Sequence, residues 1–529
     1  MRYLLHDVFI KSARDFPNNI AITVEGQSSI TYADLNTLSN KFANFYKSLK
    51  GEIRENPYVG ILSAVHEKSI AAVLGTLKIG GTYVPLDEHS PINRLANILK
   101  NTNLDVIVMD AIWYEKYKDF TKLESVKKII LLGDLEVNNQ EKVVSYQTII
   151  NSSDRELPTL NQVSDDLAYI LHSSGSTGVP KGIMLTHRNA RTFVDWMQKE
   201  FQLTSEDVVM SRAPFKFDLS VFDIFNTLNS GATLVCFDWN KIRESEQKHI
   251  DYVKLMEEQS ATILYTTPST FITFMNRGGL EQADLKLREV MYAGEPFPTP
   301  QLRRLQEVLP NTKIANIYGP TETNIITYYW IDKLPEDDTA VPLGGVVDDT
   351  EILVVSEDAT KLCEPGEIGE LWCRGGTVTI GYLGMEEKTK ESLVVSPFHK
   401  YPVKFWRTGD FGYRDEQGVL YYKGRRDHIV KVKGFRIELG EIESALAKNE
   451  NLDEFVVVAV PDEKYGSRLY CFYSTIHNVP YDGETLGGFL KDYIPEYMIP
   501  FRFVQKEVLP KTSSGKVDRV GLAEEAAKY

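Results

Sequence analysis

Residues 167–182 read LAYILHSSGSTGVPKG, and the motifs of the whole chain are organised around this stretch. Its apolar first part predicts a buried strand, and the Ser, Thr and Gly residues after it predict a loop that leads past Lys181 to a helix near Arg188. Glycines let a backbone approach a bulky anion, while hydroxyls and a lysine add donors and positive charge. We therefore predict a phosphate-binding loop. It is not the Walker loop, because no Gly-Lys-Ser/Thr follows the glycines, and taken alone it would also fit a flexible surface loop.

Composition narrows the class of protein. The chain has 529 residues, of which 43% are hydrophobic and 25% charged, so we expect a large lobe with a smaller second domain. The formal net charge of -15 argues against nucleic acid as the main partner. No apolar run is long enough for a signal peptide or a membrane span, so we expect no membrane partner. Four cysteines without metal-site spacing indicate a reducing, cytoplasmic location: Cys236, Cys363, Cys373 and Cys471.

Polar segments follow apolar, strand-like runs at four places. The first is HSSGSTG in the stretch quoted above, and the others are TTPST at residues 266–270, AGEPF at 293–297 and YGPTE at 318–322. Strand-like and helix-like runs alternate around them, which predicts an α/β fold with parallel strands. Since ligands of such folds bind at the carboxyl ends of the strands, the four segments are expected to border one crevice.

Two carboxylates interrupt the apolar run FKFDLSVFDIF at residues 215–225. Asp223 is expected to face solvent or a helix end. Asp218 is expected to be partly buried, and a buried carboxylate needs a partner. That partner is either an internal Arg or Lys or the amine of a substrate.

The composition turns strand-rich from about residue 345, which predicts a distorted β unit that closes the large lobe. Residues 424–446 predict a turn, a basic strand and a helix, and the remainder predicts a small α+β unit. Lys516 lies in a Ser/Gly loop near the end of the chain, where a lysine is either solvated or delivered into the crevice by a mobile domain. The expected fold class is thus α/β, with a large N-terminal lobe of mixed α/β subdomains and a small mobile α+β C-terminal domain.

In this order and at this spacing, the motifs resemble those of the adenylate-forming superfamily of acyl-CoA synthetases, luciferases and adenylation domains of non-ribosomal peptide synthetases. The likeness runs from SITYADLN at residues 29–36 to GKVDR at 515–519. Within the superfamily, the chain looks most like stand-alone amino-acid adenylation enzymes of the proline-activating type. The resemblance implies ATP and Mg²⁺ as cofactors, and two domains, residues 1–426 and 427–529, with a hinge at Asp427.

The resemblance also implies roles for single residues. Asn316 and Tyr318 match adenine contacts, Asp410 matches the carboxylate that binds the ribose hydroxyls, and Glu322 matches the magnesium ligand. The implied catalytic residues are Lys516, Glu322, Thr177 and Lys181. The implied nucleotide contacts are Ser173, Ser174, Gly175, Ser176, Gly178, Ala293, Gly294, Glu295, Asn316, Tyr318, Gly319, Thr321, Asp410 and Arg425.

The matching substrate pocket is largely apolar. Asp218 matches the family carboxylate that pairs with an α-amino group, which favours an amino acid over a simple carboxylic acid. The implied pocket consists of Asp218, Leu219, Phe222, Thr266 (or Tyr265 if the register shifts by one), Met291, Ala293, Ile317, Ile325 and Ile326. Large apolar side chains leave little room, so a small apolar substrate is expected. L-Proline is the leading hypothesis; alanine, D-alanine, valine and a non-protein analogue stay open.

The second half-reaction implied by the resemblance transfers the acyl group to a thiol. The small domain is expected to rotate, removing Lys516 and presenting the face at residues 431–435. Because the chain ends at Tyr529, soon after the lysine loop, the acceptor is expected to be a separate carrier protein with a phosphopantetheine thiol. Lys431, Lys433 and Arg436 are expected either to dock that carrier or to keep an exposed ribbon soluble. The competing hypotheses are an acyl-CoA ligase, a luciferase-type oxygenase and a catalytically dead nucleotide-binding regulator.

Overall fold

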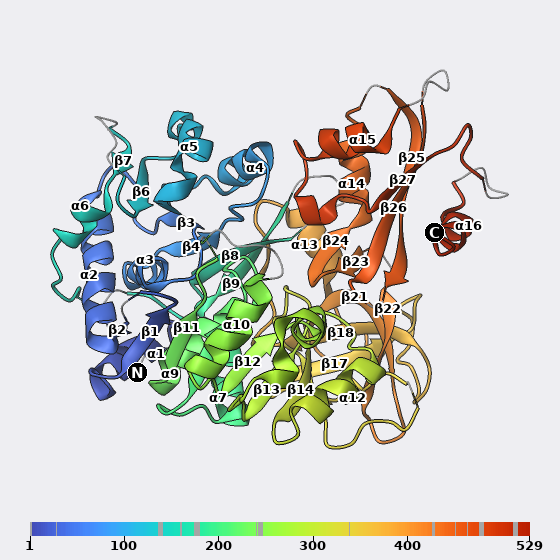
Figure 1. The fold of residues 1–529 in the computed structure, drawn as a ribbon, viewed down its shortest axis with the longest axis horizontal. Helices are drawn as coiled ribbons and strands as arrows, with labels where there is room; N and C mark the ends of the chain where they lie inside the picture. Colours follow the sequence, from blue (N-terminus) through green and yellow to red (C-terminus); the bar gives the residue numbers. More distant parts are fainter. Residues whose placement is uncertain are drawn as a thin grey trace.

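A large lobe and a small lobe form the molecule (Figure 1). The structure is a computed structural model, and it describes residues 3–27, 29–135, 141–158, 161–173, 180–239, 241, 247–337, 339–425, 429–449, 451–462, 464–475, 481–511 and 517–529. Within these residues, no helix is long and apolar enough to cross a membrane.

The sheet of the N-terminal region carries the strand that leads into the glycine-rich stretch. Its strand order is β19-β9-β8-β4-β3-β5-β6-β7, and the pairs from β8 to β7 are parallel. The strands are β3 (Tyr58–Leu62), β4 (Thr82–Pro85), β5 (Val106–Asp110), β6 (Lys128–Leu132), β7 (Val143–Val144), β8 (Leu167–Ser173), β9 (Lys181–Thr186) and β19 (Gly381–Tyr382). The helices are α2 (Tyr32–Ser48), α3 (Glu67–Lys78), α4 (Ile92–Thr102), α5 (Tyr114–Tyr117) and α6 (Tyr146–Ile150).

One feature of this sheet differs from the sequence prediction. The segment after the glycine-rich stretch forms the strand β9, which pairs antiparallel with β8, before the helix α7 (His187–Phe201) begins. Lys181 is therefore the first residue of a strand, in register with Ser173. The helix itself starts as Arg188 and Asn189 indicated, because Thr186 and Asn189 form a capping box at its N-terminus.

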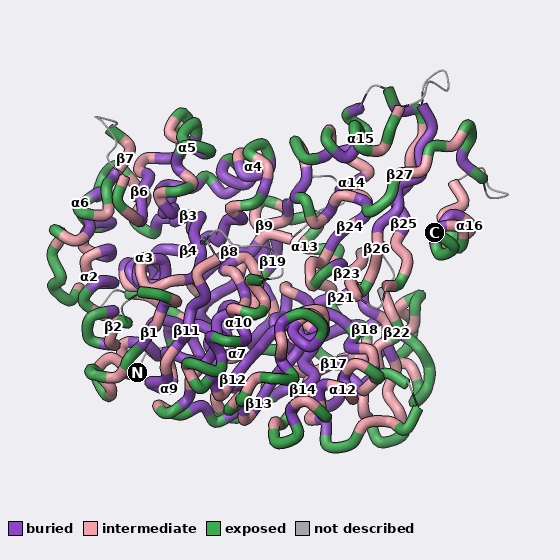
Figure 2. Tube along the Cα trace, in the orientation of Figure 1, coloured by how far each residue is buried: buried purple, intermediate pink, exposed green. Residues whose placement is uncertain are grey.

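A second sheet has the order β16-β15-β14-β13-β12-β10-β11-β1-β2, and it is parallel from β14 to β1. Its strands are β1 (Ile20–Val24), β2 (Ile30–Thr31), β10 (Val208–Ser211), β11 (Thr233–Cys236), β12 (Ile263–Thr266), β13 (Glu289–Tyr292), β14 (Lys313–Tyr318), β15 (Thr327–Trp330) and β16 (Gly345–Val346). Its helices are α1 (Asp7–Asp15), α7, α8 (Leu219–Val221), α9 (Thr227–Ser230), α10 (Gln247–Glu258), α11 (Pro268–Thr273) and α12 (Thr299–Val308). A shared hydrophobic core joins both sheets, and Figure 2 shows the central strands as buried.

An antiparallel β unit follows, as the strand-rich composition predicted. It consists of β17 (Thr350–Val355), β18 (Gly369–Gly375), β20 (Leu393–Val395), β21 (Lys404–Arg414) and β22 (Leu420–Arg425), with α13 (Glu386–Ser392) between β19 and β20.

The small lobe begins after β22 and has hydrophobic clusters of its own. It contains β23 (Ile429–Val432), β24 (Phe435–Glu438), β25 (Leu452–Asp462), β26 (Gly466–Thr475), β27 (Arg502–Gln505), α14 (Leu439–Leu446), α15 (Gly483–Leu490) and α16 (Arg519–Ala526). This arrangement confirms a separate α+β C-terminal domain. The exact boundary at Asp427 falls outside the described residues and stays a prediction.

Candidate active site

A cavity of about 420 Å³ lies where β8, β12, β13 and β14 end. Each of the four polar segments contributes to its wall, so they border one crevice even though β8 belongs to a different sheet from the other three strands. Residues of these segments that line the cavity are His172, Ser173, Thr266, Thr267, Thr270, Ala293, Gly294, Gly319, Pro320 and Thr321.

Asp218 lies on the cavity wall, directly before α8. Burial raises the pKa of its carboxyl group to about 6, against the lowering effects of the Leu219 backbone N–H, the Lys431 ammonium and the Thr321 hydroxyl. The protein groups around Asp218 thus only partly offset the cost of burying its negative charge. An ammonium group of a substrate beside this carboxylate would stabilise the charge further.

The remaining residues of the expected substrate pocket fall into two groups. Leu219, Thr266, Ala293 and Ile325 line the cavity together with Asp218, and so does the alternative residue Tyr265. The other four lie in the hydrophobic core, at most 2% exposed: Phe222, Met291, Ile317 and Ile326. The rings of Phe222 and Tyr265 meet edge to face with centroids 5.4 Å apart, so Phe222 packs directly behind the cavity-lining Tyr265.

Asp223 corrects a sequence prediction. It is fully buried instead of facing solvent, and its carboxylate accepts hydrogen bonds from the backbone N–H groups of Arg212 (3.1 Å) and Ala213 (3.2 Å). Burial raises the pKa of this carboxyl group to about 8. Asp223 therefore ties the turn after β10 to the helical segment that begins directly after Asp218.

Two residues expected around the nucleoside come together where the end of β14 meets the middle of β21. The Tyr318 hydroxyl donates to Asp410 Oδ2 at 2.7 Å, and the Tyr422 hydroxyl lies 3.5 Å from Asp410 Oδ1. Asp410 is 3% exposed. Asn316 donates its side-chain amide to the Pro342 carbonyl at 2.7 Å, so this side chain fixes the backbone beside β14. The predicted contact of Asn316 with adenine stays a prediction.

Glu295 has a contact that its motif did not indicate. Its carboxylate accepts from the backbone N–H of Ser269 and from the backbone N–H of Gly434 in the small lobe. The motif pointed to the backbone of residues 293–295, whereas the side chain joins the two lobes.

Glu322 is 1% exposed, and each of its carboxylate oxygens accepts a hydrogen bond. Arg436 of the small lobe donates to its Oε2 at 2.6 Å, and the Tyr382 hydroxyl donates to its Oε1 at 2.8 Å. Burial alone would raise the pKa of Glu322, but Arg436 lowers it to about 2. An ionised carboxylate suits Mg²⁺, which takes oxygen ligands and usually shares them with phosphates. The described residues hold no cluster of three His, Cys, Asp or Glu that could bind a metal ion.

The small lobe also reaches the expected phosphate lysine. Lys181 Nζ lies 3.1 Å from Glu438 Oε2, at the end of β24. The hairpin formed by β23 and β24 lines the cavity with Lys431, Lys433, Gly434, Phe435 and Arg436. In this structure the small lobe therefore presents the face that the sequence suggested for the second half-reaction.

A buried ion pair across the lobes was not anticipated. Arg94 in α4 pairs with Glu441 in α14, and their side chains are 8% and 1% exposed. Glu441 lies in the first turn of α14. The two residues of this buried ion pair are far apart in the chain, so no local sequence pattern links them.

Several predicted residues lie outside the described part of the chain: Ser174, Gly175, Ser176, Thr177, Gly178, Asp427 and Lys516. The side chain of Arg425, at the end of β22, also lies outside it. Their roles stay predictions.

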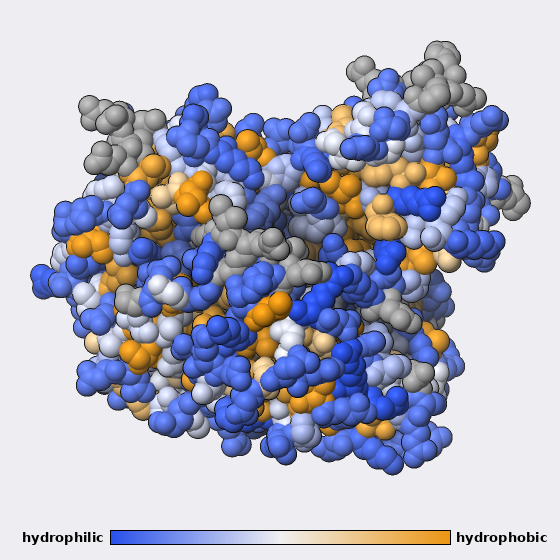
Figure 3. Space-filling model, in the orientation of Figure 1, coloured by the Kyte–Doolittle hydropathy of each residue, from blue (hydrophilic) through white to orange (hydrophobic). Residues whose placement is uncertain are grey.

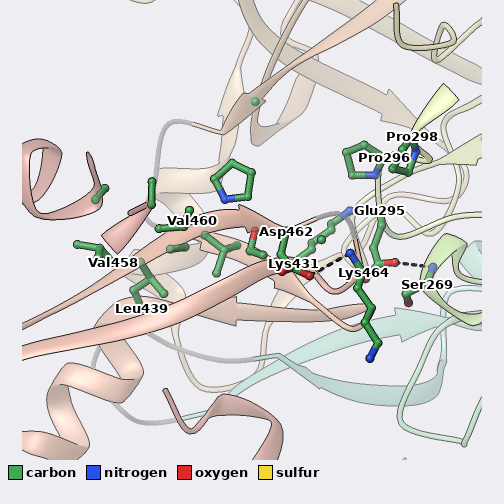
Figure 4. A pocket seen from close by; sticks show the side chains of 18 of the residues that line it. Ser269, Glu295, Pro296, Pro298, Lys431, Leu439, Val458, Val460, Asp462 and Lys464 are labelled. Atoms are coloured by element: carbon green, nitrogen blue, oxygen red, sulfur yellow. Dashed lines mark hydrogen bonds between the residues drawn. The ribbon is translucent and has the colours of Figure 1, made fainter. Parts of the chain in front are cut away.

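A wider groove of about 1030 Å³ separates the lobes beside the cavity, and Figure 4 shows it from close by. Val458 and Val460 of β25 line it from the small lobe, and Pro296 and Pro298 line it from the large lobe. Lys431 borders both this groove and the cavity. Its lining combines these apolar residues with charged ones, among them Glu295, Asp462 and Lys464.

Comparisons with known proteins agree with this geometry. The AMP-binding enzyme family matches residues 9–383, and the AMP-binding enzyme C-terminal domain matches residues 441–516. The chain is 33% identical to bacitracin synthase 1 of Bacillus licheniformis over 524 residues, which is 98% of this chain and 9% of that protein. It is 31% identical to an L-proline–[L-prolyl-carrier protein] ligase of Pseudomonas fluorescens over 523 residues, covering 98% of this chain and 99% of the ligase.

A solved structure shows the same fold. It is the Vibrio cholerae adenylation domain AlmE in complex with glycyl-adenosine-5'-phosphate, with a TM-score of 0.85 and 23% sequence identity. The match covers 100% of this chain and 98% of the AlmE chain. The fold and the site together define a two-lobed, adenylate-forming class of protein. The chain belongs to the AMP-binding enzyme family. It spans a small part, 9%, of the length of bacitracin synthase 1.

Proposed function

We propose that this chain activates a small apolar amino acid with ATP, releasing pyrophosphate, and then passes the aminoacyl group to the phosphopantetheine thiol of a carrier protein. The observation that carries this proposal is Asp218, a buried carboxylate on the wall of the same cavity as the segments expected to bind the nucleotide. A simple carboxylic acid has no ammonium group to stabilise that carboxylate.

In the first half-reaction, a carboxylate oxygen of the amino acid attacks the α-phosphate of ATP, and pyrophosphate leaves. The reaction brings anions together, so cations and N–H groups must lie where charge develops. Lys181 and the glycine-rich stretch are the proposed phosphate contacts, and Tyr318 and Asp410 the proposed nucleoside contacts. Asp218 orients the amino acid, and Lys516 is the proposed catalytic lysine. The metal, held by Glu322, would supply charge neutralisation on the phosphates.

The size of the pocket supports a small substrate. The ring of Tyr265 lines the cavity and is packed against Phe222, and Met291 and Ile317 are buried in the core. L-Proline is our leading proposal, and it is supported by the similarity to the L-proline–[L-prolyl-carrier protein] ligase of Pseudomonas fluorescens. Alanine, D-alanine and valine meet the same limits of volume and charge.

In the second half-reaction, a thiolate attacks the aminoacyl carbonyl, and AMP leaves. The groove between the lobes supports this proposal, because it could admit a long flexible arm to the cavity at Lys431. The face in Figure 3 has apolar side chains gathered over β25–β27, where Phe501 is 63% exposed. We propose that the two domains meet at a hinge at Asp427 and that the small domain rotates between the half-reactions.

Trapping the activated acid tests this function. The purified chain would be incubated with ATP, Mg²⁺, hydroxylamine and one acid at a time, and the hydroxamate identified by mass spectrometry. The panel would hold proline, both alanine enantiomers, valine, glycine, acetate and benzoate. We expect a hydroxamate from one small apolar amino acid, and its loss in Asp218→Ala. Hydroxamates from acetate or benzoate alone would contradict the proposal and favour an acyl-CoA ligase.

A further inference from the structure

Lys216, two residues before Asp218, occupies a seat formed by both lobes. Its Nζ lies 2.7 Å from Asp87 Oδ1, and the ammonium lies over three aromatic rings. The centroids are 5.9 Å away for Phe217, 5.2 Å for Phe435 and 5.5 Å for Tyr497. We call these five residues the Lys216 seat.

The rings of the seat pack against one another across the interface. Phe435 and Tyr497, both from the small lobe, stack with centroids 3.7 Å apart and planes 14° from parallel. Phe435 also meets Phe217 of the large lobe at 5.1 Å. The small lobe thus contacts the residue directly before Asp218.

The charges of the seat are well shielded from water. The side chains of Lys216 and Asp87 are 18% and 9% exposed. Burial alone would raise the pKa of Asp87, yet Lys216 and the N–H of His89 hold it below its usual value. A cation over aromatic rings gains more when it is desolvated, so the rings of the small lobe both shield Lys216 and attract it.

The contacts of Lys216 divide according to lobe. Asp87 and Phe217 belong to the large lobe, as Lys216 itself does. Phe435 and Tyr497 belong to the small lobe, so these two contacts depend on how that lobe docks. Among the other polar contacts between the lobes, the Arg94–Glu441 pair involves no residue proposed to act on ATP. The contacts at Glu322, Lys181 and Glu295 involve residues proposed to act on ATP or its metal. Lys216 is therefore a docking contact that can be altered without touching those groups.

We propose that Lys216 is a positioning residue that holds the small lobe in the orientation that presents residues 431–436 to the cavity, and that it therefore favours thioester formation over adenylation. The effect on thioester formation rests on the proposed function. The docking role of Lys216 does not, because it concerns only how the two lobes contact each other.

Docking is tested by a distance measurement that needs no substrate. Nitroxide labels would be placed on Ile112→Cys and Val508→Cys, which are exposed in the large and small lobe, in a Cys363→Ser background. Pulsed electron paramagnetic resonance would compare wild-type Lys216 with Lys216→Met and Lys216→Arg. We expect Lys216→Met to add a second distance population, and Lys216→Arg, which keeps a cation over the rings, to retain the original one.

A second experiment tests whether Lys216 favours thioester formation over adenylation. It uses the amino acid that supports pyrophosphate exchange, and phosphopantetheine as the thiol. We expect the ratio of the thioester rate to the exchange rate to fall about 10-fold in Lys216→Met and to recover in Lys216→Arg. The double variant Asp87→Asn/Lys216→Met has no unpaired carboxylate, so a similar ratio there excludes misfolding as the cause.

Equal losses in both rates, or an unchanged distance distribution in Lys216→Met, would overturn the inference. Absence of exchange in the wild-type protein would instead overturn the proposed function and with it the assignment to the second step. The distance measurement would then decide the docking role of Lys216 alone.

Discussion

Arg436 Nη1 lies 2.6 Å from Glu322 Oε2, so a cation of the small lobe is bound to the carboxylate proposed to hold the metal. Both side chains are shielded, with 19% and 2% exposure. A guanidinium and a metal ion compete for one carboxylate oxygen, and the docked orientation should therefore weaken the metal site.

Replacing Arg436 tests this competition. In Arg436→Met we expect pyrophosphate exchange to need roughly 3- to 10-fold less Mg²⁺ for half-saturation, because Glu322 loses its competing partner. A titration of exchange with Mg²⁺ measures this. Arg407→Met is the matched control, since Arg407 pairs with Glu370 within the β unit and should leave the titration unchanged. An unaltered Mg²⁺ requirement in Arg436→Met would show that the pair does not limit the metal.

Protonation of Asp218 should produce an acidic limb in the pH profile of kcat/KM, that is, a fall in kcat/KM at low pH. Its pKa of about 6 in the free protein means that the carboxylate needed by the substrate ammonium is lost as pH falls through 6. We expect kcat/KM for the amino acid to fall roughly tenfold for each pH unit below that value. Asp218→Asn should lower kcat/KM at pH 8 by about 100-fold or more and remove this limb. A limb that persists in Asp218→Asn would assign the titration to another group.

His187 makes the large lobe sensitive to acid. The Leu5 backbone N–H donates to His187 Nδ1 at 3.0 Å, and burial lowers the pKa of the ring to about 4. The unfolded chain binds a proton near pH 6.5, so the free energy of unfolding falls as pH drops from 6.5 towards 4, by about 3 kcal/mol in all. Urea unfolding at pH 7 and pH 4.5 should show most of this loss in wild type and less of it in His187→Gln. His89→Gln, with a side chain 70% exposed, should behave as wild type.

Gly319 in the YGPTE motif has no room for a side chain. A Cβ atom there would lie 2.0 Å from the Asn324 carbonyl oxygen, a contact that only backbone movement relieves. Gly319→Ala should lower the free energy of unfolding by about 2 kcal/mol or more and reduce exchange, since Tyr318 and Glu322 flank this turn. Gly488→Ala is the control, because nothing lies within 4 Å of that position in α15. It should stabilise the chain slightly, by about 0.5–1 kcal/mol.

The motifs located the site because each follows a strand whose burial is visible in the sequence. The ends of β8, β12, β13 and β14 were predictable from apolar runs, and their carboxyl edges meet at one cavity. The strand β9 was missed because a short apolar run after a glycine-rich loop fits a helix start as well as a strand. Hairpin pairing with β8 decides between them, and that pairing is a tertiary contact.

Contacts between the lobes were beyond prediction for a related reason. Arg436 and Glu322 are 114 positions apart, and each has a plausible role when considered alone. Asp223 was misjudged because its partners are backbone N–H groups, which no side-chain pattern reveals. The sequence indicates which residues carry the chemistry, and the fold determines which of them meet.

Pyrophosphate exchange with ATP tests the central claim most directly. The wild-type chain, Asp218→Ala and Lys516→Ala would be assayed with proline, both alanine enantiomers, the other protein amino acids and simple carboxylic acids. We predict strong exchange with one small apolar amino acid, and its loss in both variants. Exchange only with simple carboxylic acids, or exchange with an amino acid that is unaffected in Asp218→Ala, would contradict the account.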